Sequence, residues 1–311
     1  MKSGSIHDRE QPYLVETKGI LDSKNLPDAD FLDLWNSIIV DNEVKDRLLG
    51  QAVLNFTLRP KLKRSAVPLH GIILLVGPPG TGKTSLARGL AARTAEALSN
   101  KGRFRFLEVE PHALASAALG KSQQAVKHLL GSVIAEQAAS GPLIVVLDEV
   151  ETLAADRTKM SLEANPIDVH RATDAVLAQL DQLAVQYPDL LFIATSNFEN
   201  AIDAAFLSRA DLIEVIGLPT AQACEQILRD TVLAIAALYP PLARLVEEGP
   251  FKQAAKRAVG LDARRIRKSV LSALARDKQT AAHPEKLTSS AILAAVEQAH
   301  SSDRTSKGRH G

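Results

Sequence analysis

The sequence predicts an α/β protein in which helices flank a five-stranded parallel sheet and a small all-helical domain follows. Five short apolar runs alternate with longer helical patterns, at residues 71–76, 104–109, 143–147, 190–194 and 212–216. Strands that alternate with helices in this way form a parallel sheet covered on both faces. After Pro219 the strand-like runs stop and only amphipathic helical patterns continue. An aromatic content of only 4%, with abundant Ala and Leu, also favours helices over a β-sandwich.

Helical patterns fill the intervals between the apolar runs and the region after Pro219. They cover residues 85–99, 122–139 and 170–185 and then residues 221–238, 251–259, 263–276 and 289–300. Another begins at Phe31, and we expect its Trp35 to belong to the core and not to a cofactor site. We therefore predict a flexible N-terminal arm (1–30), a large α/β domain (31–219), a small helical domain (220–300) and a disordered tail (301–311).

Composition limits the class of function. The 37 Lys and Arg residues are balanced by 36 Asp and Glu residues, so no generally basic surface for nucleic acid is indicated, although a local basic stripe stays open. Cys224 is the single cysteine, which excludes an intramolecular disulfide and fits a reducing cytosol. No apolar run approaches the ~20 residues of a membrane-spanning helix, and no signal peptide is evident. We expect a cytoplasmic protein without a membrane partner.

Residues 77–84 read GPPGTGKT, the complete pattern of a phosphate-binding loop, between an apolar run and a helical pattern. Glycines let backbone N–H groups turn onto phosphate oxygens, and the helix N-terminus adds positive potential there. A Gly- and Pro-rich turn that contains a lysine by coincidence is the alternative. We expect Lys83 to reach the β- and γ-phosphates of ATP and the Thr84 hydroxyl to bind Mg²⁺. The residues expected to contact the nucleotide are Gly77, Pro78, Pro79, Gly80, Thr81, Gly82, Lys83, Thr84 and Ser85.

An acidic pair follows the apolar run at residues 143–147, in the sequence LIVVLDEV. Carboxylates at the C-terminal end of a parallel strand, downstream of a phosphate loop, form a Walker B arrangement. We expect Asp148 to hold Mg²⁺ through water and Glu149 to orient and deprotonate the attacking water. The alternative is that the two carboxylates cap a helix.

Two polar residues near the next strands are candidate catalytic residues. Asn197 ends the run LLFIATSN, where an amide can contact the γ-phosphate and the lytic water; an Asx-turn is the alternative. Arg209, in FLSRAD, precedes the last strand and can act on a neighbouring subunit's nucleotide as an arginine finger. A surface salt bridge with Asp211 is the alternative for Arg209.

A basic helix face lies in the sequence GLDARRIRK of the small domain. Arg264, Arg267 and Lys268 share this face by helical spacing. A solvated face or a small nucleic-acid patch is one interpretation. The other is a second sensor that reaches the γ-phosphate within the same subunit, for which Arg264 is the preferred residue.

Together, these motifs in this order resemble those of AAA+ ATPases. Four stretches narrow the resemblance to the pachytene checkpoint protein 2 family, the HORMA-domain remodellers: FLDLWNSIIVDNEVKDRLL, LDEVETLAADR, NPIDVHRATDAVLAQLDQL and ATSNFENAIDAAFLSRADLIEVIGLP. The resemblance implies an AAA+ module with a C-terminal helical lid, adenine contacts from Ile39 and Val40, and a homohexameric ring. It also implies that ATP hydrolysis partly unfolds a HORMA-domain client in the central pore and opens its closed, peptide-bound state.

The short segment before the ATPase motifs resembles the compact bacterial form of this family. That form is similar to the accessory ATPase of cyclic-oligonucleotide anti-phage signalling, so the resemblance implies restraint of a HORMA client that activates a nucleotidyltransferase. Eukaryotic members carry an N-terminal domain that receives the client with an adaptor, and the short arm leaves adaptor dependence open.

The expected first pore loop departs from the usual pattern of AAA+ translocases. An aromatic residue usually precedes an aliphatic residue and glycine, whereas this chain has Ala118, Leu119 and Gly120. We expect Leu119, with Lys121, to contact the client. A weak grip of this kind suits brief remodelling better than processive threading.

Two other functions stay open. A nucleic-acid motor such as a clamp loader would use the same ATPase motifs, but the balanced charge does not favour it. A nucleotide-gated scaffold would bind ATP without turnover, but the presence of Glu149 favours hydrolysis.

Overall fold

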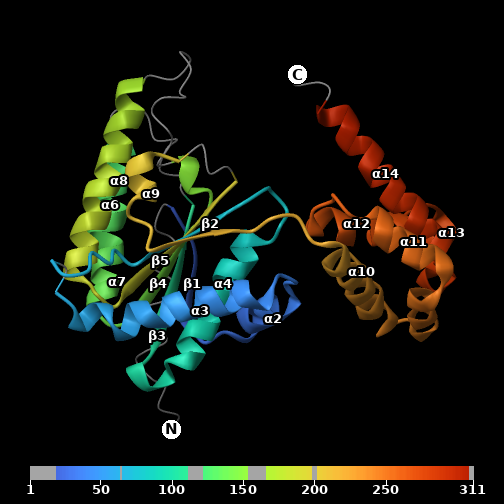
Figure 1. Ribbon diagram of the computed structural model, residues 1–311, viewed down its shortest axis with the longest axis horizontal. Coiled ribbons are helices and arrows are strands. Elements are labelled where there is room, and N and C mark those ends of the chain that lie inside the picture. The colour runs from blue at the N-terminus through green and yellow to red at the C-terminus, as the bar shows by residue number, and fades with distance from the viewer. Residues whose placement is uncertain (1–18, 64, 111–121, 153–165, 198–201, 308–311) are drawn as a thin grey trace, which may run out of the picture. The chain divides into compact units, whose positions relative to one another are not determined.

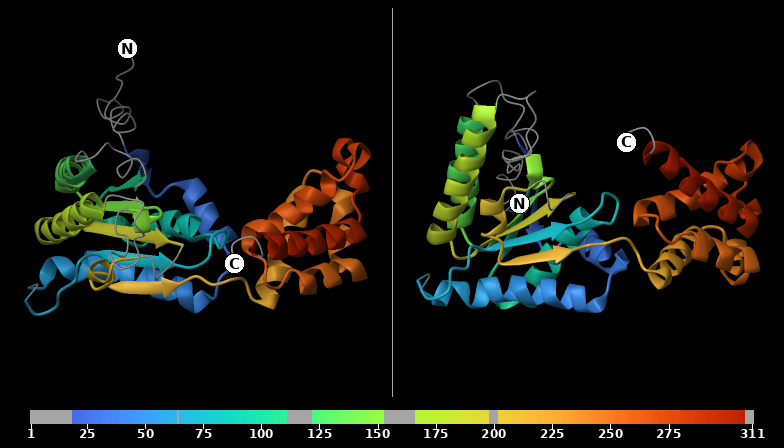
Figure 2. Two further views of the ribbon diagram at one scale, coloured as in Figure 1. Left: turned by 90° about the horizontal axis from the view of Figure 1, so that it is seen from above. Right: turned by 45° about the horizontal axis from the view of Figure 1, so that its top comes forward.

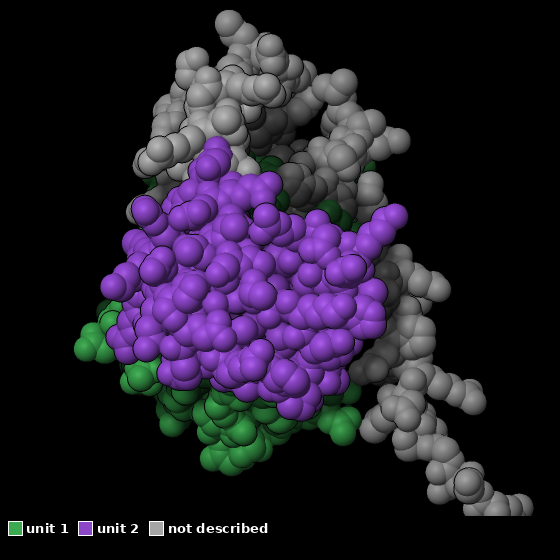
Figure 3. Space-filling view, turned by 90° about the vertical axis from the view of Figure 1, so that its right-hand side faces the viewer, with its two compact units in different colours: residues 1–77, 83–215 green, residues 78–82, 216–311 purple. Residues whose placement is uncertain are grey.

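The protein is described from a computed structural model that covers residues 19–63, 65–110, 122–152, 166–197 and 202–307 (Figure 1). The chain forms two compact units, which Figure 3 shows in different colours. The first comprises residues 1–77 and 83–215, and the second comprises residues 78–82 and 216–311. The division thus falls at residues 215–216, where we predicted 219–220, and the tip of the phosphate loop groups with the second unit.

A six-stranded sheet forms the centre of the first unit, in the order β1-β3-β4-β5-β2-β6. Five strands are parallel and coincide with the five predicted apolar runs, so this part of the fold prediction is confirmed. These strands are β2 (Ile72–Val76), β3 (Phe104–Val109), β4 (Leu143–Leu147), β5 (Leu190–Ser196) and β6 (Leu212–Val215). Because they run in one direction, the segments that follow β2, β4 and β5 lie at the same edge of the sheet (Figure 1).

The remaining strand, β1 (Ile20–Leu26), corrects two predictions. It pairs antiparallel with β3, so the sheet is mixed and six-stranded, and the prediction of a flexible arm over residues 1–30 is wrong for this segment. Only the two end residues of β1 are buried. An edge strand with a solvent-facing middle lacks the apolar alternation by which a strand is detected in sequence.

Helices cover both faces of the sheet, as predicted (Figures 1 and 2). One face carries α2 (Ala29–Ser37), α3 (Asn42–Thr57) and α4 (Lys83–Ala97). The other carries α6 (Ser122–His128), a π-helical segment (Leu129–Ile134), α7 (Ala135–Ala139) and α8 (Pro166–Gln186). Side chains of each strand alternate between these two faces. The central strands are buried along their whole length, so the sheet holds the loops at its edge on a rigid base.

The helix that follows the phosphate loop is anchored by a close contact with α2. A Cβ atom on Gly89 of α4 would lie 2.8 Å from the Trp35 Cβ, so only glycine permits this approach. Trp35 is buried at 6% exposure, which confirms the prediction that it belongs to the core. The short elements of this unit are 3₁₀ turns at Arg59–Lys61, Ser99–Lys101 and Val150–Thr152 and the helix α9 (Ala204–Leu207).

The second unit is all-helical over its described residues from 216 onward. Its helices are α10 (Ala221–Ala236), α11 (Gly249–Arg257), α12 (Ala263–Leu274), α13 (Lys278–Ala282) and α14 (Ser289–Lys307), with 3₁₀ segments at Pro240–Glu247 and Pro284–Lys286. Thr220 and Asp262 cap α10 and α12 by accepting backbone N–H groups of their first turns. Helix α14 continues to Lys307, so the prediction of a disordered tail from residue 301 is wrong for residues 301–307.

None of the helices in the described ranges combines the length and apolar character that crossing a membrane requires.

Candidate active site

The phosphate loop connects β2 to α4 and depends on glycine at two positions. Gly80 and Gly82 have φ values of 82° and 95°, which residues with side chains rarely adopt. Lys83 begins α4 and is buried at 6% exposure. Its Nζ donates to the carbonyl oxygen of Gly77 at 2.8 Å. The lysine side chain therefore folds back along the loop that the sequence predicts to hold phosphates.

Asp148 follows β4 and receives hydroxyl groups from two other elements. Its Oδ1 accepts from Thr84 Oγ1 of α4 at 2.7 Å and from Thr195 Oγ1 of β5 at 2.5 Å. The structure thus brings together Thr84 and Asp148, the two predicted metal ligands. A hydroxyl and a carboxylate side by side offer the oxygen donors that Mg²⁺ prefers.

Glu149 adopts a strained backbone conformation. Its φ of 54° is the one positive φ of a non-glycine residue in the described ranges, and such a conformation costs about 1–3 kcal/mol. Its N–H donates to Thr195 Oγ1 at 3.1 Å, and its carbonyl oxygen accepts the N–H of Thr152 at 3.1 Å. Strain that the surroundings impose in this way is concentrated at functional sites.

Asn197, the last described residue after β5, connects the phosphate loop to the acidic pair. Its Oδ1 accepts from Lys83 Nζ at 3.0 Å, and its Nδ2 donates to Glu149 Oε1 at 3.1 Å. Its backbone N–H donates to Glu151 Oε1 at 3.1 Å. The amide is therefore engaged with both predicted catalytic charges, which an Asx-turn does not explain.

The alternative role of the acidic pair, helix capping, is not supported either. The partners described for the Asp148 and Glu149 carboxylates are side chains of other elements, whereas a capping carboxylate accepts backbone N–H groups.

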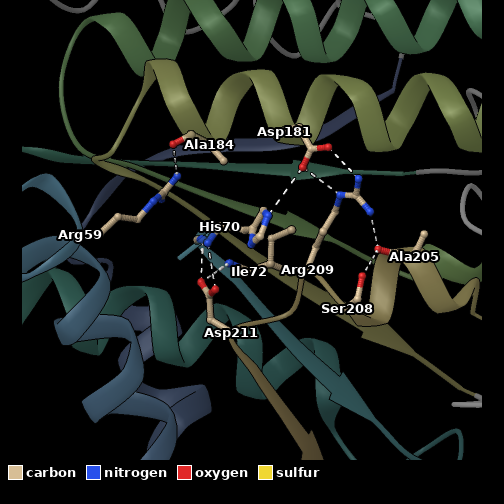
Figure 4. Close-up of polar contacts among 10 residues, drawn as sticks. Arg59, His70, Ile72, Asp181, Ala184, Ala205, Ser208, Arg209 and Asp211 are labelled. Carbon is tan, nitrogen blue, oxygen red and sulfur yellow. Dashed lines mark hydrogen bonds and ion pairs between the residues drawn. The ribbon is translucent and has the colours of Figure 1, made fainter. Parts of the chain in front are cut away.

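Arg209 lies in a second polar cluster (Figure 4). Its Nε and Nη2 donate to the two carboxylate oxygens of Asp181, on α8, at 2.9 and 2.7 Å, and its Nη1 donates to the Ala205 carbonyl at 2.6 Å. The hydrogen bonds to Asp181 raise the pKa of the Arg209 guanidinium above its ordinary value. His70 Nε2 lies 3.7 Å from the Asp181 carboxylate.

Asp211, the alternative partner that the sequence offered for Arg209, has another role. The Asp211 carboxylate accepts the backbone N–H groups of His70, Gly71 and Ile72 at 2.9, 2.6 and 3.1 Å (Figure 4). Asp211 thus fixes the start of β2, and the proposed salt bridge between Arg209 and Asp211 is wrong, because Asp181 takes that place.

The other residues predicted to bind the nucleotide or the client have fewer described contacts with the site. Ile39 and Val40 are half-buried between α2 and α3. Within the second unit, the Arg264 N–H donates to the Gly80 carbonyl at 3.2 Å. The predicted pore residues Ala118, Leu119, Gly120 and Lys121 lie outside the described residues.

Three site residues were missed by sequence reasoning: Thr195, Glu151 and Asp181. Thr195 had a detectable signal, since it is a polar residue inside an apolar strand and lies two positions before Asn197, a spacing at which strand side chains point to the same side. Glu151 and Asp181 had none, because the residues they contact, Asn197 for Glu151 and Arg209 and His70 for Asp181, come close only in the fold.

The fold and the site together define a class: a P-loop ATPase with Walker A and Walker B motifs and a C-terminal helical unit. The family described as "ATPase family associated with various cellular activities (AAA)" matches residues 73–218. The chain is 57% identical over 282 residues to CD-NTase-associated protein 6 of Pseudomonas aeruginosa. The aligned region covers 91% of this chain and 92% of that protein. The chain therefore belongs to the AAA ATPase family, in the group that includes this relative, and it is a nucleotide-binding ATPase.

More distant relatives confirm the predicted resemblance. The human pachytene checkpoint protein 2 homolog is 34% identical over 215 residues, 67% of this chain, which spans about half of that relative (49%). The structure of C. elegans PCH-2 aligns with a TM-score of 0.72 at 24% identity, over 92% of this chain and 77% of that one. A chain of the E. coli MS115-1 HORMA:CdnC:Trip13 complex aligns with a TM-score of 0.71 at 18% identity, over 90% and 95%. These two structures show that the fold is shared.

Proposed function

We propose that this protein is an ATP-driven remodeller that works as a hexameric ring in the bacterial cytoplasm. Its client is a HORMA-domain protein, which it partly unfolds so that the client's closed, peptide-bound complex comes apart. Through this client it restrains a nucleotidyltransferase of cyclic-oligonucleotide anti-phage signalling. The proposal is supported by the match to CD-NTase-associated protein 6 over 92% of that relative, and by the fold shared with a chain of a HORMA:CdnC:Trip13 complex.

The observation that carries the enzymatic part is the convergence of Lys83, Asn197 and Glu149 at one edge of the sheet. The buried Lys83 is bonded to oxygens of the loop and of Asn197, so phosphate oxygens can replace acceptors that are already in place. We assign nucleotide binding to the loop residues 77–85. Mg²⁺, held by Thr84 and through water by Asp148, would neutralise charge on the β- and γ-phosphates.

Glu149 is the proposed general base for hydrolysis. A water oxygen attacks the γ-phosphorus, the bond from that phosphorus to the β–γ bridging oxygen breaks, and Glu149 accepts the water proton. The hydrogen bond from Asn197 holds the Glu149 carboxylate while the same amide faces Lys83. Asn197 therefore contacts both the lysine of the phosphate loop and the proposed base.

Arg209 is the proposed arginine finger for a neighbouring subunit. Developing charge on the γ-phosphate is what such an arginine stabilises. For Arg264 we propose contact with the γ-phosphate in the same subunit, and for Ile39 and Val40 contact with adenine. These three roles rest on the family resemblance and on sequence position.

Leu119 is the proposed client contact in the pore. It is the one sizeable apolar side chain in the expected pore slot, and burying one leucine is worth about 2 kcal/mol. Several subunits that act together can hold an extended client segment with contacts of this size.

Peptide release tests the proposed function. A HORMA protein closed around a fluorescent peptide is mixed with the wild-type protein and ATP, and the loss of fluorescence anisotropy is followed. We expect ATP-dependent release by the wild type and none by Glu149→Gln. Glu136→Gln, a loss of charge at an exposed position on α7, is the matched control and should release the peptide normally. ATPase activity that DNA stimulates and a HORMA protein does not would contradict the proposal and favour a nucleic-acid motor.

A further inference from the structure

The Thr195 hydroxyl joins the two carboxylates that follow β4, and none of the roles above uses it. Thr195 lies on β5 among apolar residues and is buried at 1% exposure. A buried hydroxyl in such a strand needs hydrogen-bond partners, because leaving it unpaired is costly. Both of the partners described for its hydroxyl belong to the acidic pair, Asp148 and Glu149.

The two bonds use the hydroxyl as donor and as acceptor. Thr195 Oγ1 donates to Asp148 Oδ1 at 2.5 Å, and it accepts the Glu149 N–H at 3.1 Å. A single oxygen therefore fixes the side chain of one carboxylate residue and the backbone of the next. β5 in turn is hydrogen-bonded to β2 on one side and β4 on the other, so this oxygen is held by the sheet.

Each bond restrains a degree of freedom that the site needs to control. Glu149 has a φ of 54°, and an acceptor for its N–H helps to keep this unfavourable conformation. Asp148 Oδ1 is shared between the Thr84 and Thr195 hydroxyls, so this carboxylate oxygen is held from two elements. Neither hydroxyl uses Oδ2.

We propose that Thr195 is a positioning residue of the ATPase site, which holds the metal-binding and water-activating carboxylates in their working geometry. The inference rests on the proposed roles of Asp148 and Glu149. Thr195 acts through these residues, and the two hydrogen bonds described for Lys83 are made to Gly77 and Asn197. Its loss should therefore lower kcat and leave the KM for ATP nearly unchanged.

Three substitutions separate the hydroxyl from the volume of the side chain. Thr195→Ser keeps the hydroxyl and loses the methyl group. Thr195→Ala differs from Thr195→Ser only by the loss of the hydroxyl. Thr195→Val replaces the hydroxyl by a methyl group, so the side chain keeps nearly the same size. In steady-state ATPase assays we expect the alanine and valine variants to lose about tenfold or more in kcat, because a hydrogen bond to a charged group and a backbone restraint are lost together. The serine variant should stay within about threefold of the wild type, and all three should bind a fluorescent ATP analogue with similar affinity.

Equal kcat for the serine and alanine variants overturns the proposal, because these two differ only in the hydroxyl. Loss of nucleotide binding together with turnover in the alanine and valine variants also overturns it, since Thr195 would then be a packing residue. Glu149→Gln in the same assay distinguishes a failure of the proposed function from a failure of the role proposed for Thr195. If Glu149→Gln hydrolyses ATP normally, the proposed function fails. If Glu149→Gln is inactive while Thr195→Ala matches the serine variant, only the role of Thr195 fails.

Discussion

Two polar clusters in the first unit are built differently. The strand-end cluster consists of Lys83, Thr84, Asp148, Glu149, Thr195 and Asn197, and the bonds described above link its members to one another. The Arg209 cluster consists of His70, Asp181, Arg209 and Asp211. In it, Asp181 orients Arg209 while Asp211 binds backbone N–H groups of residues 70–72.

The difference shows which parts of the proposed mechanism are complete within one chain. The strand-end cluster already contains the predicted phosphate cation, metal ligands and base, linked by hydrogen bonds through Asn197 and Thr195. Arg209 uses three of its five N–H donors on Asp181 and Ala205 among the described residues, so its direction is set while donors remain for a further acceptor. We infer that the strand-end cluster acts on its own nucleotide and that Arg209 completes the site of a neighbour.

The largest expected effects fall in the strand-end cluster. We expect Lys83→Ala to abolish nucleotide binding, because the loop loses its cation. Glu149→Gln should bind ATP in a stable ring but lose at least ~10²-fold in turnover, because the base is gone. Nucleotide binding and phosphate release measure the two effects separately. Near-normal turnover by Glu149→Gln would show that the catalytic base does not belong to this cluster.

Arg209→Ala should also lower turnover strongly, by at least ~10²-fold, without loss of nucleotide binding. The physical reason is that the arginine stabilises charge only as the γ-phosphate is transferred. ATPase assays and equilibrium binding of a fluorescent nucleotide check this split. Full activity of Arg209→Ala, or a protein that stays monomeric with ATP bound, would contradict a role between subunits.

A smaller effect is expected for the residue that orients Arg209. Asp181→Asn should lower turnover several-fold and change the unfolding midpoint little, because the pair is partly exposed, with the Asp181 side chain 39% accessible. Asp211→Asn is the contrasting variant. It should mainly lower the unfolding midpoint, because a carboxylate that accepts three backbone N–H groups is replaced. Higher turnover in Asp181→Asn would mean that the pair competes with the finger instead of positioning it.

The sequence was sufficient for the parts of the fold with strong local patterns. The five parallel strands, their flanking helices and the loop at residues 77–84 were all predicted, and the bonds of Asn197 agree with its predicted position at the site. β1 was missed because only its ends are buried. The alternative partner of Arg209 was mistaken because Asp211 is the nearest carboxylate in the sequence. Asp181 lies on another helix, and only the fold brings it to Arg209.

The smallest effect on basal turnover is expected at Leu119. Leu119→Ala should leave ATPase activity without a client largely intact, because this residue belongs to neither cluster. It should remove client-stimulated ATPase and the release of peptide from a labelled HORMA complex. Unchanged release would show that the client is gripped elsewhere.

Mixing of two inactive variants tests most directly whether the two clusters work across a subunit boundary. Arg209→Ala subunits keep an intact strand-end cluster, and Lys83→Ala subunits keep an intact Arg209. If the clusters meet between subunits, some interfaces in a mixed ring contain both intact parts. We therefore predict phosphate release well above the sum of the two variants measured alone, and release that depends on mixing before ATP is added. Activity no greater than that sum, in mixed rings shown to have assembled, would contradict a site shared between two subunits.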